Sequence, residues 1–206
     1  MRLRRCGTDA VLVEVDSLAE VDAVRAALDA AAERGELPEL TEVVPAARTV
    51  LAVVRPGSGG LAAVRAALPT ELVQPPRTTA REVVIPVRYD GPDLDLVAEA
   101  AGMSVAQVIT THAGARYSVA FCGFAPGFGY LVGLPEPLRQ ARLAEPRTSV
   151  PAGSVGIAGE FTGAYPRSSP GGWRLLGHTE AVLFDPRREP PALLAPGDQV
   201  RFQALW

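Results

Sequence analysis

The side chains best suited to proton transfer in this chain of 206 residues are its two histidines, His112 and His178. Histidine ordinarily titrates near neutral pH, which makes it the natural general acid or base. His112 falls near the end of an expected helix, where the helix dipole favours a cation, so a chemical and a structural role are both open. His178 follows a glycine at the expected start of a strand, which indicates a turn or surface position. Neither histidine has H-E-x-x-H or H-x-x-E-H spacing, so we predict no metal site.

A polar, glycine-rich segment between Pro146 and Thr179 is a second region with chemical potential. Its polar side chains alternate with glycines that allow a ligand to approach the backbone closely. They are Arg147, Ser149, Ser154, Glu160, Thr162, Tyr165, Ser168 and Ser169. This composition is typical of a polar binding pocket.

The stretch "FCGFAPGFGYLVGLP" from Phe121 to Pro135 combines aromatic rings with glycine and proline. It lacks the G-x-G-x-x-G spacing of a dinucleotide loop, and the chain lacks the G-x-S-x-G elbow of serine hydrolases. Each ring taken alone favours a place in a core. The rings taken together, on a loop that prolines make rigid, favour one wall of a pocket.

The composition is that of an ordinary globular protein with a formal net charge of −3. We therefore expect neither a nucleic-acid nor a membrane-surface partner. The absence of an apolar run of about 20 residues and of a signal-peptide pattern predicts a cytoplasmic protein. The chain has no lysine, which excludes lysine Schiff bases and P-loop lysines. Cys6 and Cys122 lie far apart in sequence and are expected to be reduced.

The first 80 residues are expected to form an α/β unit in the order β-α-β-β-α-β, as in ferredoxin-like domains. The elements are a strand at Ala10–Val15, a helix from Ser17 to Gly35, two strands or a strand and a turn within Thr41–Val54, a helix at Gly59–Pro69 and a strand at Arg81–Val87. Ser17 and Glu20 have capping-box spacing, and Gly35 supplies a stop signal.

A proline-containing linker, Leu72–Glu82, places a domain boundary near residue 80, between domains 1–80 and 81–206. Two short helices follow at Pro92–Gly102 and Ser104–Gly114. Beyond residue 116, short apolar segments separated by glycine and proline predict an all-β barrel or sandwich. These segments are Tyr117–Phe121, Gly153–Gly159, Trp173–Gly177 and Ala181–Asp185.

Four collinear motifs connect the chain with a known family: "GFAPGFGYLVGLP", "PRTSVPAGSVGIAG", "TGAYPRSSPGGWRLLGHT" and "LLAPGDQVRF". They resemble the KipI-like family, which includes the small subunit of allophanate hydrolase and the B subunit of bacterial 5-oxoprolinase. The resemblance covers nearly the whole chain. It implies an α+β protein in which the N-terminal ferredoxin-like α/β domain is followed by a cyclophilin-like β-barrel.

The resemblance also implies a function in a complex. The chain is expected to be a non-autonomous subunit of an ATP-dependent hydrolase that converts 5-oxoproline to glutamate, and to be inactive alone. The expected partners are a KipA/PxpC-like, carboxyltransferase-related subunit and a LamB/YcsF-like subunit, with ATP used by the complex. Alternatives are a KipI-type inhibitor of a sporulation histidine kinase, a subunit of a urea- or allophanate-related amidohydrolase or carboxylase, and an assembly module without chemistry.

Site residues carried over from the family motifs fall into two groups. The catalytic pair is His112, as proton carrier, and Arg147, as a carboxylate or phosphate clamp. The substrate-binding group is Phe128, Tyr130, Gly153, Ser154, Thr162, Ser169 and Trp173. The backbone amides of Gly153 and Ser154 are the expected oxyanion donors. Arg142 and Arg147 have an alternative interpretation as surface arginines that pair with Glu145 or with a partner subunit.

The chain departs from the family motifs at three positions. Phe161 stands where the family typically has glutamine, His178 where arginine is usual, and Glu180 where proline is usual. Phe161 removes a polar group, and His178 and Glu180 weaken any charge clamp in that turn. These departures leave the identity of the substrate undecided.

Overall fold

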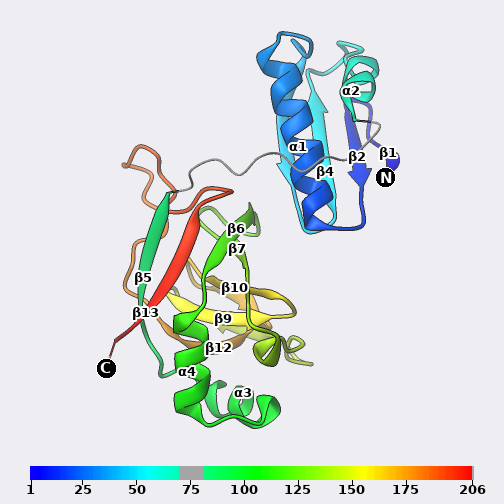
Figure 1. Ribbon diagram of the computed structural model, residues 1–206. Coiled ribbons are helices and arrows are strands. Elements are labelled where there is room, and N and C mark those ends of the chain that lie inside the picture. The colour runs from blue at the N-terminus through cyan, green and yellow to red at the C-terminus, as the bar shows by residue number, and fades with distance from the viewer. Residues whose placement is uncertain (70–80, 206) are drawn as a thin grey trace. The chain divides into compact units, whose positions relative to one another are not determined.

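The computed structural model describes residues 1–69 and 81–205, which belong to two compact units, Met1–Thr78 and Thr79–Trp206 (Figure 1). In this part of the chain the architecture is mixed α/β, with a closed seven-stranded barrel and four α-helices, as the α+β prediction requires. The linker expected at Leu72–Glu82 lies mostly outside the described residues. The boundary at residue 80 therefore stays a prediction.

The first unit is an antiparallel four-stranded sheet with two helices, and its strand order is β1-β2-β4-β3. The elements are β1 (Arg2–Cys6), β2 (Ala10–Glu14), α1 (Leu18–Glu33), β3 (Leu40–Pro45), β4 (Thr49–Val54) and α2 (Leu61–Ala67). Alternate residues of β2 and β4 are buried and pack with one face of α1. This pattern follows from the two-residue period of a strand facing an apolar helix.

Helix α1 begins and ends where its local sequence predicts. The Ser17 hydroxyl accepts a hydrogen bond from the Glu20 amide (3.3 Å), and the Glu20 carboxylate accepts one from the Asp16 amide (2.8 Å). Gly35 follows the helix with φ +75°, a left-handed conformation that glycine adopts without strain.

The predicted order β-α-β-β-α-β is wrong for the first unit. The observed order is β-β-α-β-β-α, because Arg2–Cys6 forms an edge strand beside β2 and the strand near residue 85 belongs to the barrel. Every residue of β1 is exposed and three of its five residues are arginines, so it carries no hydrophobic alternation. Pairing of its backbone with β2 makes it a strand despite that composition.

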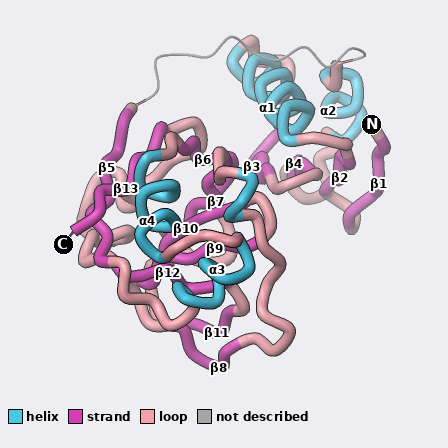
Figure 2. Tube along the Cα trace, turned by 60° about the horizontal axis from the view of Figure 1, so that its bottom comes forward, coloured by secondary structure: helices cyan, strands magenta, loops and turns pink. Residues whose placement is uncertain are grey.

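The second unit is built on a closed barrel with the strand order β10-β7-β6-β13-β5-β12-β9. The strands are β5 (Glu82–Arg88), β6 (Tyr117–Cys122), β7 (Gly129–Val132), β9 (Ser154–Ala158), β10 (Phe161–Ala164), β12 (Arg174–His178) and β13 (Gln199–Leu205). A separate two-stranded sheet joins β8 (Arg147–Val150) and β11 (Ser169–Gly171) (Figure 2). A 3₁₀ turn, η1, spans Glu136–Leu138. The predicted strands at Tyr117, Gly153 and Trp173 are confirmed.

All seven strands place apolar side chains in one buried cluster, which fills the barrel interior. Helices α3 (Leu94–Ala101) and α4 (Val105–Gly114) add side chains to this cluster. Both helices were expected. The Ser104 capping box on α4 is complete, since Ser104 Oγ accepts from the Gln107 amide (3.2 Å) and Gln107 Oε1 accepts from the Ser104 amide (2.8 Å).

The strand predicted at Ala181–Asp185 is wrong. This segment forms one isolated bridge, Phe184 with Ala192, and otherwise runs as a loop. Leu183 is buried in the barrel cluster, but Val182 is exposed. Single apolar side chains therefore anchor the loop without a paired strand.

Candidate functional site

An aromatic cluster covers one outer face of the barrel wall. It consists of Phe121, Phe124, Phe128, Tyr130, Phe161, Tyr165 and Trp173. Neighbouring ring centroids lie 4.4 Å apart at the closest pair, Phe121 and Tyr130, and 6.3 Å apart at Tyr165 and Trp173. Phe128, Tyr130 and Trp173, which the sequence predicts as substrate-binding residues, lie together in this cluster.

Strand β10 shows how the wall separates this cluster from the barrel interior. Thr162 and Ala164 face inward, toward His112 and the barrel core. Gly163 faces outward, and a Cβ added to it would lie 2.8 Å from the Gly129 carbonyl oxygen, 3.3 Å from Trp173 and 3.4 Å from Phe128. The glycine therefore lets the backbone of β7 approach closely and leaves room for the outer rings.

Phe124 is the most exposed member of the aromatic cluster, with 56% of its surface accessible. It has φ +67° although it is not glycine, a conformation that costs a large side chain on the order of 1–3 kcal/mol. Its ring meets Phe128 and Tyr165 edge-on, with centroids 5.3 and 6.0 Å apart. The loop therefore holds an aromatic face toward solvent at a cost in backbone strain, an arrangement typical of binding sites.

Arg147 is held by a buried carboxylate that the sequence analysis did not identify. Its Nη2 donates to Asp93 Oδ1 (2.7 Å), and Asp93 Oδ2 accepts from the Leu175 amide (2.7 Å). A weaker contact joins Arg147 Nη1 to the Trp173 carbonyl (3.4 Å). The alternative pairing with Glu145 is not found among the described residues. Asp93 fixes the guanidinium beside Trp173 and neutralises its charge.

His112 and Thr162 lie on the other side of the wall, in the barrel interior. The Thr162 hydroxyl donates to the Gly156 carbonyl (2.9 Å), so it must accept from His112 Nε2 (2.9 Å). The Tyr89 hydroxyl then donates to His112 Nδ1 (2.7 Å). The ring stacks on Phe202 with centroids 4.7 Å apart.

The expectation that the helix C-terminus favours a charged His112 is wrong. The side chain is fully buried, and desolvation lowers its pKa to about 3. Burial outweighs the helix dipole here, because the dipole contributes on the order of 1 kcal/mol whereas burial of a charge costs several. His112 is a neutral imidazole with both nitrogens hydrogen-bonded. Its role as a proton carrier stays a prediction.

Acid is expected to destabilise the second unit through His112. The imidazole titrates at about 6.5 in an unfolded chain, whereas burial lowers the pKa of His112 to about 3 in the folded one. Its contribution to stability is complete above about pH 6.5 and is lost toward pH 3, at about 1.4 kcal/mol per pH unit. Between pH 6.5 and 5, denaturant unfolding should therefore show a loss of stability larger by about 2 kcal/mol in the wild type than in His112→Phe. Parallel pH curves for the two proteins would contradict this expectation.

The backbone amides predicted as oxyanion donors are already occupied. The Gly153 amide donates to the Tyr165 carbonyl (2.7 Å) and the Ser154 amide to the Pro151 carbonyl (3.3 Å). Gly153 has φ +80°, and any side chain there would collide with the Thr179 carbonyl. This position closes a tight backbone crossing and leaves no free donor, which corrects the oxyanion assignment.

Two remaining positions lie at the margins of the barrel. Ser169 is in β11, opposite Val150 of β8, and its buried hydroxyl has no hydrogen-bond partner in the described part of the chain. His178 is half-exposed at the end of β12, not at its start, and its Nδ1 lies 2.8 Å from Asp90 Oδ1.

Comparisons with known proteins identify the family. A family model described as "Carboxyltransferase domain, subdomain C and D" matches residues 1–194. A relative from Escherichia coli O157:H7, named as the B subunit of 5-oxoprolinase, is 41% identical over an alignment of 213 positions that covers 98% of this chain and 96% of the relative. This chain belongs to the carboxyltransferase subdomain C and D family. The resemblance to the family of 5-oxoprolinase B subunits is thereby confirmed.

The solved structures that resemble this chain include longer chains. The crystal structure of TTHA0988 superposes with a TM-score of 0.79 at 38% identity, and the match covers 100% of this chain but 40% of that one. The K. lactis urea amidolyase gives a TM-score of 0.77 at 22% identity, over 98% of this chain and 15% of that one. The second likeness shows the shared fold alone. This chain thus spans less than half of these two solved proteins.

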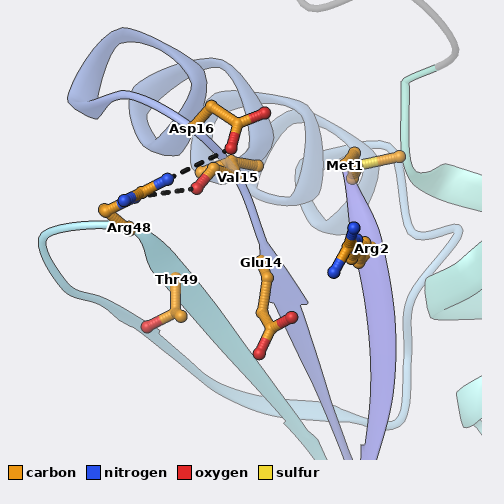
Figure 3. A pocket seen from close by; sticks show the side chains of 7 residues that line it. All are labelled: Met1, Arg2, Glu14, Val15, Asp16, Arg48 and Thr49. Atoms are coloured by element: carbon orange, nitrogen blue, oxygen red, sulfur yellow. Dashed lines mark hydrogen bonds and ion pairs between the residues drawn. The ribbon is translucent and has the colours of Figure 1, made fainter.

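A hollow of about 420 Å³ in the first unit does not include any site residue expected from the family motifs (Figure 3). It is lined by Met1, Arg2, Glu14, Val15, Asp16, Arg48 and Thr49. Arg48 there donates to the Asp16 carboxylate (3.1 Å) and to the Val15 carbonyl (3.4 Å), so its charge is already paired. Among the described residues we find no cluster of three metal-ligating side chains and no helix long and apolar enough to cross a membrane.

Proposed function

We propose that this chain is a subunit of an ATP-dependent 5-oxoprolinase complex, which hydrolyses 5-oxoproline to glutamate. The observation that carries the proposal is the 41% identity with the B subunit of a 5-oxoprolinase over 98% of this chain and 96% of that protein. Such a match leaves no large segment of the relative without a counterpart. We further infer a cyclophilin-like barrel and a cytoplasmic location, as the resemblance implies.

The reaction breaks the amide C–N bond of the lactam ring, adds a hydroxyl to the carbonyl carbon and a proton to the nitrogen. An amide resists attack by water, so the substrate must be held and oriented closely. In our proposal the rings of Phe128, Tyr130 and Trp173 underlie the protein surface that binds the substrate. Arg147, whose guanidinium is held by Asp93, borders the same surface. His112 and Thr162 position β10 from within the barrel.

The residues of this chain do not fit a P-loop site for a nucleoside triphosphate. The chain has no lysine, and its described part has no cluster of three carboxylate or imidazole ligands for the accompanying metal ion. We propose ATP use at the level of the complex. The partners we propose are a carboxyltransferase-related subunit and a LamB/YcsF-like subunit.

A role in a urea-directed enzyme is the second candidate, because the fold recurs in urea amidolyase at a TM-score of 0.77. At 22% identity this likeness carries the fold and not the substrate. The 5-oxoprolinase proposal therefore takes precedence.

Co-expression of the three subunits tests the proposal. The purified complex is expected to release glutamate from 5-oxo-L-proline only with ATP, and a preparation that omits this chain is expected to release none. The chain alone is expected to be inactive. A well-formed complex that turns over urea or allophanate but not 5-oxoproline would refute the proposal in favour of the second candidate.

A further inference from the structure

Asp93 lies in the turn between β5 and α3, and its backbone is fastened to strand β12. The Asp93 amide donates to the Leu175 carbonyl (3.1 Å), and the Gly91 amide donates to the Leu176 carbonyl (3.1 Å). Gly91 allows this close approach, since a Cβ there would collide with the Leu175 carbonyl. The barrel wall therefore sets the position of Asp93.

The Asp93 carboxylate does not serve its own helix. An aspartate just before a helix commonly accepts a hydrogen bond from one of the first helical amides. Asp93 holds that position before α3, but its side chain makes no such bond. Its two oxygens accept instead from Arg147 Nη2 (2.7 Å) and from the Leu175 amide (2.7 Å). The carboxylate is thus committed to a residue 54 positions later in the chain.

Stability alone is a poor reason for a buried ion pair of this kind. Loss of one partner is costly, but replacement of both partners by apolar side chains often leaves a fold as stable as before. The Asp93 side chain is 3% exposed, which is the lowest value for a carboxylate in any ion pair of the described residues. The pair therefore fits a role in holding Arg147 in one orientation.

Arg147 lies beside Trp173 of the aromatic cluster. Its Nη1 donates to the Trp173 carbonyl (3.4 Å), and its backbone pairs with Gly171 of β11. The centroid of the Trp173 ring lies 5.3 Å from that of Phe128 and 5.7 Å from that of Tyr130. Arg147 therefore borders the rings that underlie the substrate in the proposed function.

The Arg147 guanidinium keeps donors that the described part of the chain does not use. Of its five N–H groups, one donates to Asp93 and one to the Trp173 carbonyl, which leaves three. The side chain is 28% exposed, so a small solute can reach it. Because Asp93 neutralises the charge, these donors favour a ligand that matches their direction. A carboxylate does so, since it accepts two parallel bonds from a guanidinium.

We propose that Asp93 is a positioning residue of the substrate site. It fixes the Arg147 guanidinium beside Trp173, so that the free N–H groups bind the carboxylate of a small cyclic amide acid. The inference rests on the proposed function, since 5-oxoproline has this carboxylate. Asp93 is not among the site residues expected from the family motifs. Of the carboxylate or phosphate that those motifs left open for Arg147, the inference selects the carboxylate.

A double-mutant cycle on the assembled complex tests the inference by steady-state kinetics. Arg147→Gln is expected to raise the KM for 5-oxo-L-proline by about tenfold, with kcat changed much less. Asp93→Asn keeps an oxygen for the Leu175 amide and should raise KM by about fivefold. In the Arg147→Gln background the same Asp93 change should alter KM by less than about twofold, because Asp93 acts through Arg147.

Two results of the cycle would overturn the inference while the proposed function stands. One is an active complex in which Arg147→Gln leaves KM unchanged. The other is an equal rise of KM on Asp93→Asn in both backgrounds, which is the behaviour of a residue that supports only the fold.

Asp198 supplies the matched control. It also pairs with an arginine, Arg81, and accepts from a backbone amide, that of Ala195 (2.9 Å), and its side chain is 11% exposed. It lies just before β13, a strand that contributes no ring to the aromatic cluster. Asp198→Asn should therefore leave KM within about twofold of the wild type. Equal rises of KM in Asp198→Asn and Asp93→Asn would indicate general loosening of the barrel and contradict a positioning role.

Ligand-observed NMR on the complex separates the inference from the proposed function. The probes are 5-oxo-L-proline and 2-pyrrolidinone, which keeps the lactam ring but lacks the carboxylate. Arg147→Gln and Asp93→Asn are expected to weaken binding of the first probe only. Equal weakening of both probes would mean that these residues shape the surface without binding the carboxylate, and the inference would be wrong.

The NMR result also decides the case of an inactive complex. If the wild-type complex releases no glutamate but binds 5-oxo-L-proline in a manner that depends on Arg147 and Asp93, the proposed function fails and the inference stands. Absence of binding to the wild-type complex, together with absence of turnover, would overturn both.

Discussion

Replacing His112 with alanine is expected to lower the free energy of unfolding of the second unit by about 3–5 kcal/mol. The change leaves a cavity beside Phe202 and removes the acceptor of the partly buried Tyr89 hydroxyl. Thr162 keeps its bond to the Gly156 carbonyl but loses the contact that ties β10 to α4. Denaturant unfolding followed by tryptophan fluorescence measures the effect, because both tryptophans belong to the second unit.

His178→Ala is the matched control. His178 is half-exposed and paired with Asp90 at the surface, so its loss should cost less than about 1 kcal/mol. The comparison also bears on chemistry. If His112→Ala folds with wild-type stability and the assembled complex loses turnover, a proton-carrier role gains support and a purely structural role for His112 is wrong.

Signals that act within one helical turn predicted the helices well. Ser17 and Ser104 cap α1 and α4 through residues three positions away, and Gly102 ends α3 with φ 63°. These are local hydrogen bonds that depend on few other parts of the fold. Strand β1 shows the opposite case. Its exposed, arginine-rich sequence carries no signal of its own, and its structure depends on pairing with β2.

The site was predicted in its residue types more than in its arrangement. The motif residues Phe128, Tyr130 and Trp173 do gather, because alternation at the start of β7 turns Phe128 and Tyr130 to the face on which Trp173, just before β12, packs against both. No sequence spacing indicates that this wall separates them from His112. Nor does any spacing connect Arg147 with Asp93, 54 residues earlier. The glycines of the polar segment were predicted to let a ligand approach the backbone. Gly153 shows that such a glycine can instead allow two backbone segments to pack tightly.

Asp93 is expected to be the carboxylate whose loss is most damaging to the fold. Asp93→Ala should lower the free energy of unfolding of the second unit by about 3–5 kcal/mol, because it removes one partner of a buried ion pair. The side chain is 3% exposed and serves two groups at once, the Arg147 guanidinium and the Leu175 amide. Its removal leaves a buried amide without an acceptor and a partly buried guanidinium without its counter-ion.

Two further variants separate these contributions. Asp93→Asn keeps an oxygen for the Leu175 amide and loses the charge, so it should fall between wild type and alanine. Asp95→Ala, an exposed carboxylate in the first turn of the same helix, should cost no more than about 1 kcal/mol through the helix dipole. A double-mutant cycle with Arg147→Gln then isolates the ion pair. Arg147→Gln keeps an amide donor but leaves the buried Asp93 carboxylate, which is 3% exposed, without its counter-ion, so it should also cost more than Asp95→Ala. A cost for Arg147→Gln no larger than that of Asp95→Ala would contradict a stabilising buried ion pair.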